Sequence, residues 1–401
     1  MDSLTQIVLG AAVGEAVLGK KIGNRAMIWG AIGGTIPDLD VMTNLFMGEL
    51  QAMCAHRGIT HSIFFSIVAP LAFAWLLSYL YRSGAYRATG YKAFISIINT
   101  IVLALIVYGV YAASGSMPVL ILSGAFAAYL IWRLYKYYLA KELSDVRVSF
   151  KEWYLLFFLA FFTHIALDCF TTYGTQIFQP FSDLRVAFNT IAVADPAYTL
   201  PFIIFLVAAV FSSKGSRRRS ILNWTGIGIS SLYLLFTVFN RAHIDNVFER
   251  ALDHRGIEVE RQMVSPTLLQ NVLWNCVAES DTAYFVGMYS MFDSDPNMHS
   301  IQSLRKDPEA TSELEGTLEY EALEWFSNGY LYTIDNDSLY DLYDLRFGPS
   351  RYRDVMNAPE DYVFRFQLRP VADGLKFNQV QPETGDIGEE FKRFTRRVKG
   401  Y

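Results

Sequence analysis

The chain has 401 residues, of which 52% are hydrophobic, 15% are aromatic and only 18% are charged. A soluble domain of average composition carries about 25% charged residues, so the composition excludes both a disordered chain and a uniformly soluble enzyme. The charge is divided unevenly. Residues 1–240 hold 17 basic and 11 acidic side chains, a net charge of +6, whereas residues 241–401 hold 17 and 28, a net charge of −11. The three widely spaced cysteines do not form a disulfide framework or a cysteine zinc site.

The first half of the chain is a succession of apolar stretches. Two short ones, 3–19 and 24–36, are rich in glycine and alanine. Small residues let helices approach closely within a bilayer, so we expect a packed helical hairpin. Six more suit transmembrane helices of about 20 residues; they are residues 62–81, 93–113, 117–139, 152–170, 196–213 and 221–240. We therefore predict a multi-pass α-helical membrane domain of about six to eight helices over residues 1–240.

The basic residues indicate how these helices are oriented. Fifteen of the 17 lie in the alternate segments 20–25, 82–92, 133–151 and 214–219. Cytoplasmic loops carry an excess of Lys and Arg, so these segments are predicted to be cytoplasmic. Loops 37–61 and 171–195, together with everything after residue 240, are then predicted to lie outside. We expect the protein in a bacterial inner membrane, with an extracytoplasmic C-terminal region.

The second half, 241–401, has no stretch able to span a membrane. Residues 283–289 and 362–368 have the composition of strands, and residues 306–327 are acidic and favour a helix. We predict a soluble, strand-rich α+β domain over 241–401.

Ionisable residues gather at the predicted outer ends of the helices. They form four groups: Asp38 with Asp40, His56 and Arg57 with His61, His164 with Asp168, and Asp195 before a proline. Polar residues at membrane depth are costly and mark functional sites. Because the topology was assigned from Lys and Arg alone, the gathering of all four groups at one face favours a shared site.

The residue types in these groups suit a divalent metal ion. His164 and Asp168 are four residues apart, so their side chains leave one face of a helix. Imidazole and carboxylate ligands favour zinc, with manganese or iron as alternatives. We predict that one or two ions are bound by six metal ligands: His56, His61, His164, Asp168, Asp38 and Asp40. Helix capping by Asp38 or Asp195 remains an alternative.

Such a site predicts hydrolysis at the membrane boundary. A bound ion lowers the pKa of water, and Asp40 or Asp195 would accept the proton. Arg57 and Arg185, the two predicted outer arginines, would bind an anionic group. We expect membrane lipids as partners, an amphiphilic or lipid-linked phosphoester as substrate, and no nucleic acid; the oligomeric state is unknown. A metal-stabilised scaffold that binds a partner and a metal-ion transporter are alternative functions.

The motifs Asp38-x-Asp40, His56-Arg-Gly-x-Thr-His61-Ser and Thr163-His164-x-x-x-Asp168 resemble the bacterial YdjM-like family of inner-membrane metal-dependent hydrolases, described as LexA-regulated. The similarity covers the membrane half, and Pro266-Thr267 and Trp274 are similar to the family's C-terminal part. It implies a membrane-embedded hydrolase with a divalent metal at His56, His61, His164 and Asp168, with the two aspartates beside them. More distantly, the His-x-x-x-Asp helix resembles one ligand pair of the zinc-dependent phospholipase C and P1 nuclease group.

Overall fold

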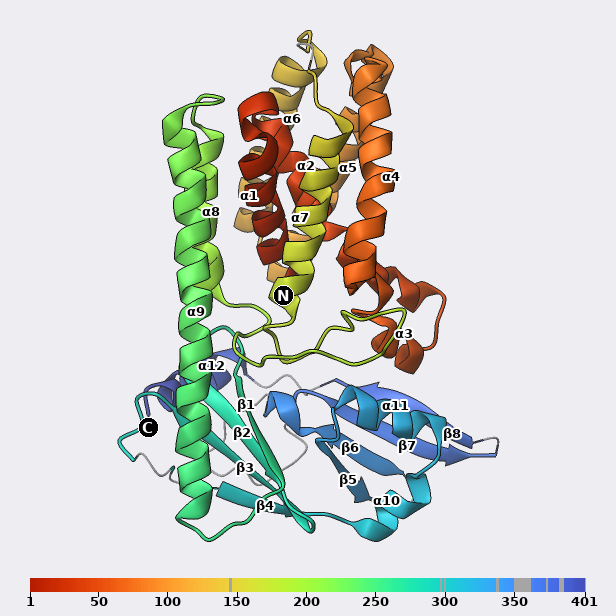
Figure 1. Ribbon diagram of the computed structural model, residues 1–401, viewed down its shortest axis with the longest axis vertical. Coiled ribbons are helices and arrows are strands. Elements are labelled where there is room, and N and C mark those ends of the chain that lie inside the picture. The colour runs from red at the N-terminus through yellow and green to blue at the C-terminus, as the bar shows by residue number, and fades with distance from the viewer. Residues whose placement is uncertain are drawn as a thin grey trace. The chain divides into compact units, whose positions relative to one another are not determined.

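The computed structural model describes residues 1–143, 146–295, 298, 301–336, 339–349, 362–372, 374–381 and 386–400 (Figure 1). The chain divides into two compact units. One consists of Met1–Val68 with Phe158–Tyr401, and the other of Ala69–Phe157. As predicted, the first half of the chain is helical and the second half is rich in strands. The candidate metal-site residues all lie in the first unit.

The two glycine-rich stretches form a closely packed hairpin. They are α1 (Ser3–Ile22) and α2 (Asn24–Thr35). A Cβ atom added at Gly10 would collide with the carbonyl oxygen of Gly30, and one at Gly14 would collide with that of Ala26. Only glycine therefore permits this separation of the two backbones, as expected for close helix packing in a membrane.

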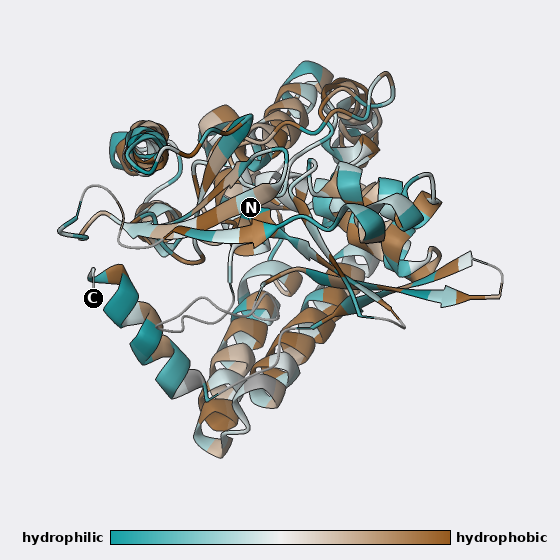
Figure 2. Cartoon of the chain, turned by 90° about the horizontal axis from the view of Figure 1, so that it is seen from below, coloured by the Kyte–Doolittle hydropathy of each residue, from teal (hydrophilic) through white to brown (hydrophobic). Residues whose placement is uncertain are grey.

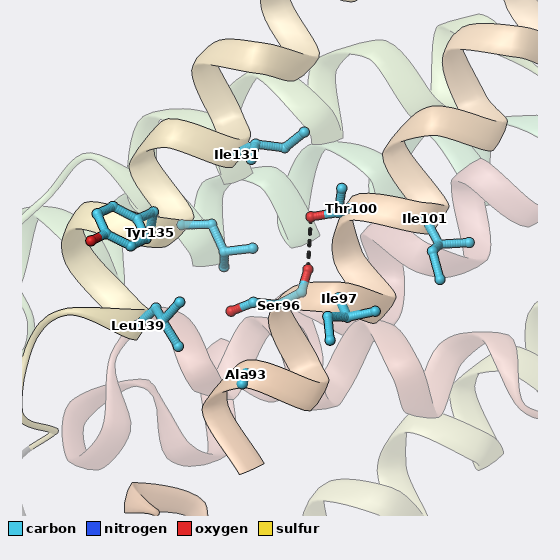
Figure 3. Close-up of a pocket in the computed structure, with 9 residues that line it drawn as sticks. Ala93, Ser96, Ile97, Thr100, Ile101, Ile131, Tyr135 and Leu139 are labelled. Atoms are coloured by element: carbon cyan, nitrogen blue, oxygen red, sulfur yellow. Dashed lines mark hydrogen bonds between the residues drawn. The ribbon is translucent and has the colours of Figure 1, made fainter. Parts of the chain in front are cut away.

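Within the part of the chain that the structure describes, five helices are long and apolar enough to cross a membrane. They are α4 (Ile63–Arg82), α5 (Thr89–Ser114), α6 (Met117–Leu134, continued by a π-helical turn, Tyr135–Leu139), α7 (Phe150–Asp168) and α9 (Arg217–Asp253). The shorter apolar helix α8 spans Pro196–Val210. Within the second unit, an open cavity of about 330 Å³ lies between α5 and α6 and is lined mainly by apolar side chains such as Ile97, Ile101 and Ile131 (Figure 3). The prediction of a multi-pass helical protein is confirmed.

Helix α9 continues beyond the expected membrane stretch that ends at residue 240. Its apolar positions recur at helical spacing as Ile244, Val247 and Phe248, which are buried against the first sheet around Trp274. The helix therefore joins the membrane half to the strand-rich half without a break, as Figure 1 shows. The domain boundary at residue 240 stays a prediction.

The described residues of the C-terminal half form two four-stranded antiparallel sheets in which neighbours in sequence are neighbours in space. The first is β1 (Arg261–Pro266), β2 (Leu273–Glu279), β3 (Ala283–Ser290) and β4 (Ile301–Arg305); the second is β5 (Leu331–Asp335), β6 (Tyr340–Asp344), β7 (Arg365–Val371) and β8 (Gly374–Val380). The helices there are α10 (Pro308–Leu314), α11 (Leu318–Phe326) and α12 (Ile387–Val398). The acidic stretch 306–327 thus forms two helices, separated at Gly316, whose φ of 80° lies in the left-handed region.

Short helices shape the loops at the predicted outer ends. Segment 37–61 contains η1 (Pro37–Leu45), α3 (Glu49–Ala55) and η2 (Ile59–His61), while η3 (Ala85–Arg87) and η5 (Leu345–Phe347) lie elsewhere. The backbone N–H of Gln176 donates to the carbonyl of Arg57 at 3.0 Å, and the Asn271 side chain donates to the carbonyl of Thr190 at 2.7 Å. Segments 37–61 and 171–195 and the C-terminal half are therefore in contact with one another within the first unit.

Candidate metal centre

Four of the predicted ligands come together from three separate elements. Asp38 lies in the first turn of η1, His61 ends η2, and His164 and Asp168 occupy the last turns of α7. One ligand atom from each lies within 4.8 Å of the other three. Two imidazole nitrogens and two carboxylate oxygens thus form a group that could bind a metal ion.

The separations of these donors match the size of a metal ion. The Nε2 atoms of His61 and His164 are 3.2 Å apart, and each lies 3.4 Å from Oδ1 of Asp38 and from Oδ2 of Asp168. Zinc bonds of about 2.0–2.1 Å place tetrahedral ligands about 3.3 Å apart. Oδ2 of Asp168 is also buried without a hydrogen-bond partner. The four side chains therefore fit one divalent ion.

Both histidines are held with Nε2 facing the centre. His164 donates from Nδ1 to the carbonyl of Gly34 at 2.7 Å, and Nδ1 of His61 lies 3.2 Å from Oδ2 of Asp40. Hydrogen bonds of this kind fix the tautomer and ring orientation of metal-binding histidines. With both Nδ1 atoms donating, two neutral rings would direct their lone pairs at each other. A cation between them removes that repulsion.

Helix packing positions the pair on α7. Gln6 of α1 donates to Oδ1 of Asp168 at 2.9 Å and to the carbonyl of His164 at 3.3 Å. The glycine contacts between α1 and α2 bring Gln6 and Gly34 to the same place. Gln6 was not among the residues predicted from the sequence, although a buried amide in an apolar helix is a signal of the same kind as the ionisable residues.

His56 and Asp40 form a second pair beside the four donors. His56 donates from Nδ1 to Oδ1 of Asp40 at 2.8 Å, and the backbone N–H of Arg57 donates to Oδ2 at 2.8 Å. The ring centroids of His56 and His61 are 6.1 Å apart. Both residues were predicted as metal ligands, and this role stays a prediction. They lie outside the group of four, and Asp40 orients the two histidines.

Contacts between carboxylates and histidines shift the pKa values of the cluster residues that lie in the loop 37–61. Burial would raise the pKa of Asp38 and Asp40, but hydrogen bonds from the histidines outweigh it and hold both pKa values well below the ordinary range. Burial would lower the pKa of His61, but bonds to Asp168, Asp38 and Asp40 raise it to about 10. Because histidine ligands must be deprotonated at the atom that binds the ion, metal binding at this cluster would depend on pH.

Arg57 is buried against the centre. Its Nη1 donates to Oγ1 of Thr171 at 2.7 Å, its Nε lies 3.4 Å from Oδ2 of Asp168, and its guanidinium lies 5.0 Å from the ring centroid of Tyr173. It also has a left-handed backbone, with φ of 57°. The guanidinium thus offsets the negative charge of Asp168 and holds Thr171 in place. The predicted role of Arg57 in binding an anion stays a prediction.

Arg185 lies at the boundary with the C-terminal half. Its guanidinium carbon is 4.9 Å from the ring centroids of Tyr173 and Trp325 and 4.7 Å from that of Phe326. Burial, with the nearby Arg346, lowers the pKa of Arg185 to about 10. The aromatic side chains hold this cation as a link between the 171–195 loop and α11. The proposed substrate contact of Arg185 stays a prediction.

Two further acidic residues of the membrane half have structural partners. Asp195 caps α8 by accepting from the N–H of Ala197 at 2.9 Å, and it accepts from the Tyr233 hydroxyl at 2.9 Å. This is the helix-capping alternative, and both carboxylate oxygens of Asp195 are engaged. Glu15, in the middle of α1, pairs with Arg219 of α9.

Comparison with known proteins identifies the family. The uncharacterized protein YfhP of Bacillus subtilis (strain 168) is 23% identical over 373 residues, which cover 90% of this chain and 89% of that protein. No solved structure matches the chain. Residues 1–244, which include all four donors, match the family model described as YdjM inner membrane protein. The chain therefore belongs to the YdjM inner membrane protein family.

Proposed function

We propose that this chain is a membrane-embedded, metal-dependent hydrolase that cleaves a lipid or lipid-linked phosphoester at the outer membrane boundary. The observation that carries the proposal is the group of Asp38, His61, His164 and Asp168, whose donor separations suit one divalent ion. Zinc is favoured by these separations, with manganese and iron as the alternatives that accept the same ligands.

The surroundings of Asp38 support a lipid substrate. Its side chain is 18% exposed, whereas those of the other three donors are at most 1% exposed. The same short helix, η1, leads into Leu45 and Phe46, which are 72% and 85% exposed. An exposed apolar segment of this kind favours contact with acyl chains. An amphiphile could therefore bring its polar group to Asp38 while its chains stay in the bilayer.

Different residues of the chain would bind the metal and transfer the proton. A divalent ion at the four donors would supply a Lewis acid and a water of lowered pKa. His56 is oriented by Asp40 through Nδ1, and its side chain is 31% exposed. This arrangement of a histidine and an orienting carboxylate is that of a general base. We assign proton transfer to His56, in place of Asp40 and Asp195, whose oxygens are already engaged.

Two variants separate these roles. His164→Ala removes a donor, so metal content measured by mass spectrometry of the purified protein should fall together with turnover of a total lipid extract. His56→Gln should retain the metal and lose the turnover. Unchanged metal in His164→Ala would refute the metal centre, and loss of metal in His56→Gln would make His56 a ligand rather than a base.

A metal-stabilised scaffold is the second candidate, because four protein donors at tetrahedral separations can complete the coordination of zinc. Structural zinc sites are closed in this way, whereas catalytic ones keep an open position. The absorption spectrum of the Co²⁺-loaded protein distinguishes the two. A four-coordinate spectrum that does not respond to added phosphate supports the scaffold, and a five- or six-coordinate one supports the hydrolase.

We also propose that the C-terminal half is extracytoplasmic. The support is the alternation of basic segments in the sequence, which assigns segments 37–61 and 171–195 to the outside, and the contacts that these segments make with the C-terminal half. A cysteine introduced at the exposed Ser312 should react with a membrane-impermeant maleimide in intact cells. Reaction only after lysis would reverse the orientation.

A further inference from the structure

Large apolar side chains are exposed around one end of the first C-terminal sheet. Phe188 is 47% exposed, Leu268 is 54%, Leu269 is 53%, Phe292 is 64% and Phe391 is 64% exposed. We propose that these five residues, the apolar rim, insert into the interfacial layer of a bilayer that contains anionic lipids, and so anchor the C-terminal half to the membrane surface independently of the metal centre.

Hydrogen bonds place the loops that carry the rim next to one another. The Asn271 side chain donates to the carbonyl of Thr190 at 2.7 Å, which links the β1–β2 loop to the loop of Phe188. The N–H of Met291 donates to the carbonyl of Val272 at 3.0 Å, which brings Phe292 to the same end of the sheet. The rim is therefore one region rather than a scatter of exposed residues.

Helix α12 is attached to that region. Arg397 donates from Nη1 to Oδ1 of Asp293 at 2.6 Å, and the Ser290 hydroxyl donates to the carbonyl of Val398 at 2.5 Å. Phe391, Phe394 and Val398 recur at spacings of three and four, as on an amphipathic helix. Figure 2 shows that most of α12, which leads to the C-terminus, is otherwise hydrophilic.

The depth and charge of this region favour a membrane over a soluble partner. Asn240, the last residue of the apolar stretch of α9, donates to the carbonyl of Asn271 at 2.6 Å, so the rim begins where α9 leaves the bilayer. Residues 387–399 hold five basic and two acidic side chains, a net charge of +3, within a half whose net charge is −11. Interfacial helices combine an apolar face with basic residues in this way and bind anionic lipids.

Spin labels on the full-length protein in nanodiscs test the proposal. Single cysteines replace Phe391, Phe292 and Leu269 in a Cys54→Ser background, because Cys169 and Cys276 are buried. The matched control is Arg393→Cys, half a turn from Phe391 on α12, and the aqueous reference is Ser312→Cys. In discs with anionic phosphatidylglycerol, we expect the ratio of oxygen to nickel-chelate accessibility at the three rim positions to be several-fold higher than at the two controls.

The other outcomes each overturn the proposal. A ratio at the rim equal to that at Ser312 would show a surface in water. Rim labels shielded from both oxygen and the nickel chelate would show a covering protein instead. With neutral phosphatidylcholine discs, the ratio at Phe391 should fall towards the control, and an unchanged ratio would show that the basic residues of α12 do not contribute to binding the membrane.

Discussion

Arg219→Leu is expected to destabilise the membrane bundle strongly. Arg219 donates from Nε to Oε1 of Glu15 at 2.6 Å, from Nη2 to Oε2 at 2.5 Å, and from Nη1 to Oδ1 of Asn24 at 2.6 Å. Arg219 is 2% exposed and Glu15 is 7% exposed. Removing the guanidinium leaves a buried carboxylate without its partner, and breaking such a pair costs about 3–5 kcal/mol.

The matched control and the double variant decide whether the pair causes that loss. Arg218 is the adjacent, exposed arginine, so Arg218→Leu should change the free energy of unfolding by no more than about 0.5 kcal/mol. Glu15→Leu combined with Arg219→Leu removes both charges, and replacing a whole buried pair by apolar residues is often neutral. The double variant should therefore be more stable than Arg219→Leu alone.

The assay is equilibrium unfolding in mixed detergent micelles, followed by tryptophan fluorescence. If Arg219→Leu costs no more than Arg218→Leu, or if the losses of Glu15→Leu and Arg219→Leu simply add, the pair does not stabilise the bundle and the reasoning is refuted. Additive losses would show that each side chain acts through other neighbours.

Three further predictions address the metal, the acid stability and the helix packing. Asp40→Asn should weaken zinc binding about 10–100-fold, because an orienting carboxylate is lost; competition with a chelating dye measures this, and an unchanged Kd contradicts it. Burial would raise the pKa of Glu279, but its partners Lys306 and Arg261 hold it below its ordinary 4.5. The stability from this group is thus complete above pH 4.5 and is lost as the pH falls through the folded-state pKa, so the thermal midpoint of Glu279→Gln should depend less on pH in acid; an identical pH profile would show that the carboxylate contributes nothing. Gly30→Val should lower the thermal midpoint because its Cβ meets the α1 backbone, whereas Gly109→Ala, with open space around it, should not; equal effects would rule out close α1–α2 packing as the cause.

The local features of this protein could be predicted from residues that are close together in the chain. Runs of about 20 apolar residues predict membrane helices wherever they occur, because each helix satisfies its own backbone hydrogen bonds in lipid. The four-residue spacing of His164 and Asp168 likewise predicted a shared helix face, which the structure confirms with both side chains directed at one point. The small residues of α1 and α2 predicted their close approach. Each of these inferences depends on neighbours in the chain.

Which polar groups come into contact could not be predicted, because it depends on the packing of distant segments. Asp38 is 23 residues from His61 and 126 from His164. No spacing rule could therefore distinguish Asp38, which belongs to the group of four, from Asp40 two residues later, which orients the histidines. Asp195 has a carboxylate of the kind that binds metal ions, but in the structure it caps helix α8. Likewise, the continuation of α9 beyond residue 240 depends on burial against a sheet that follows it in sequence. Packing between distant segments assigned these roles, because the partner of a buried polar group is determined by proximity in the fold rather than by its place in the sequence.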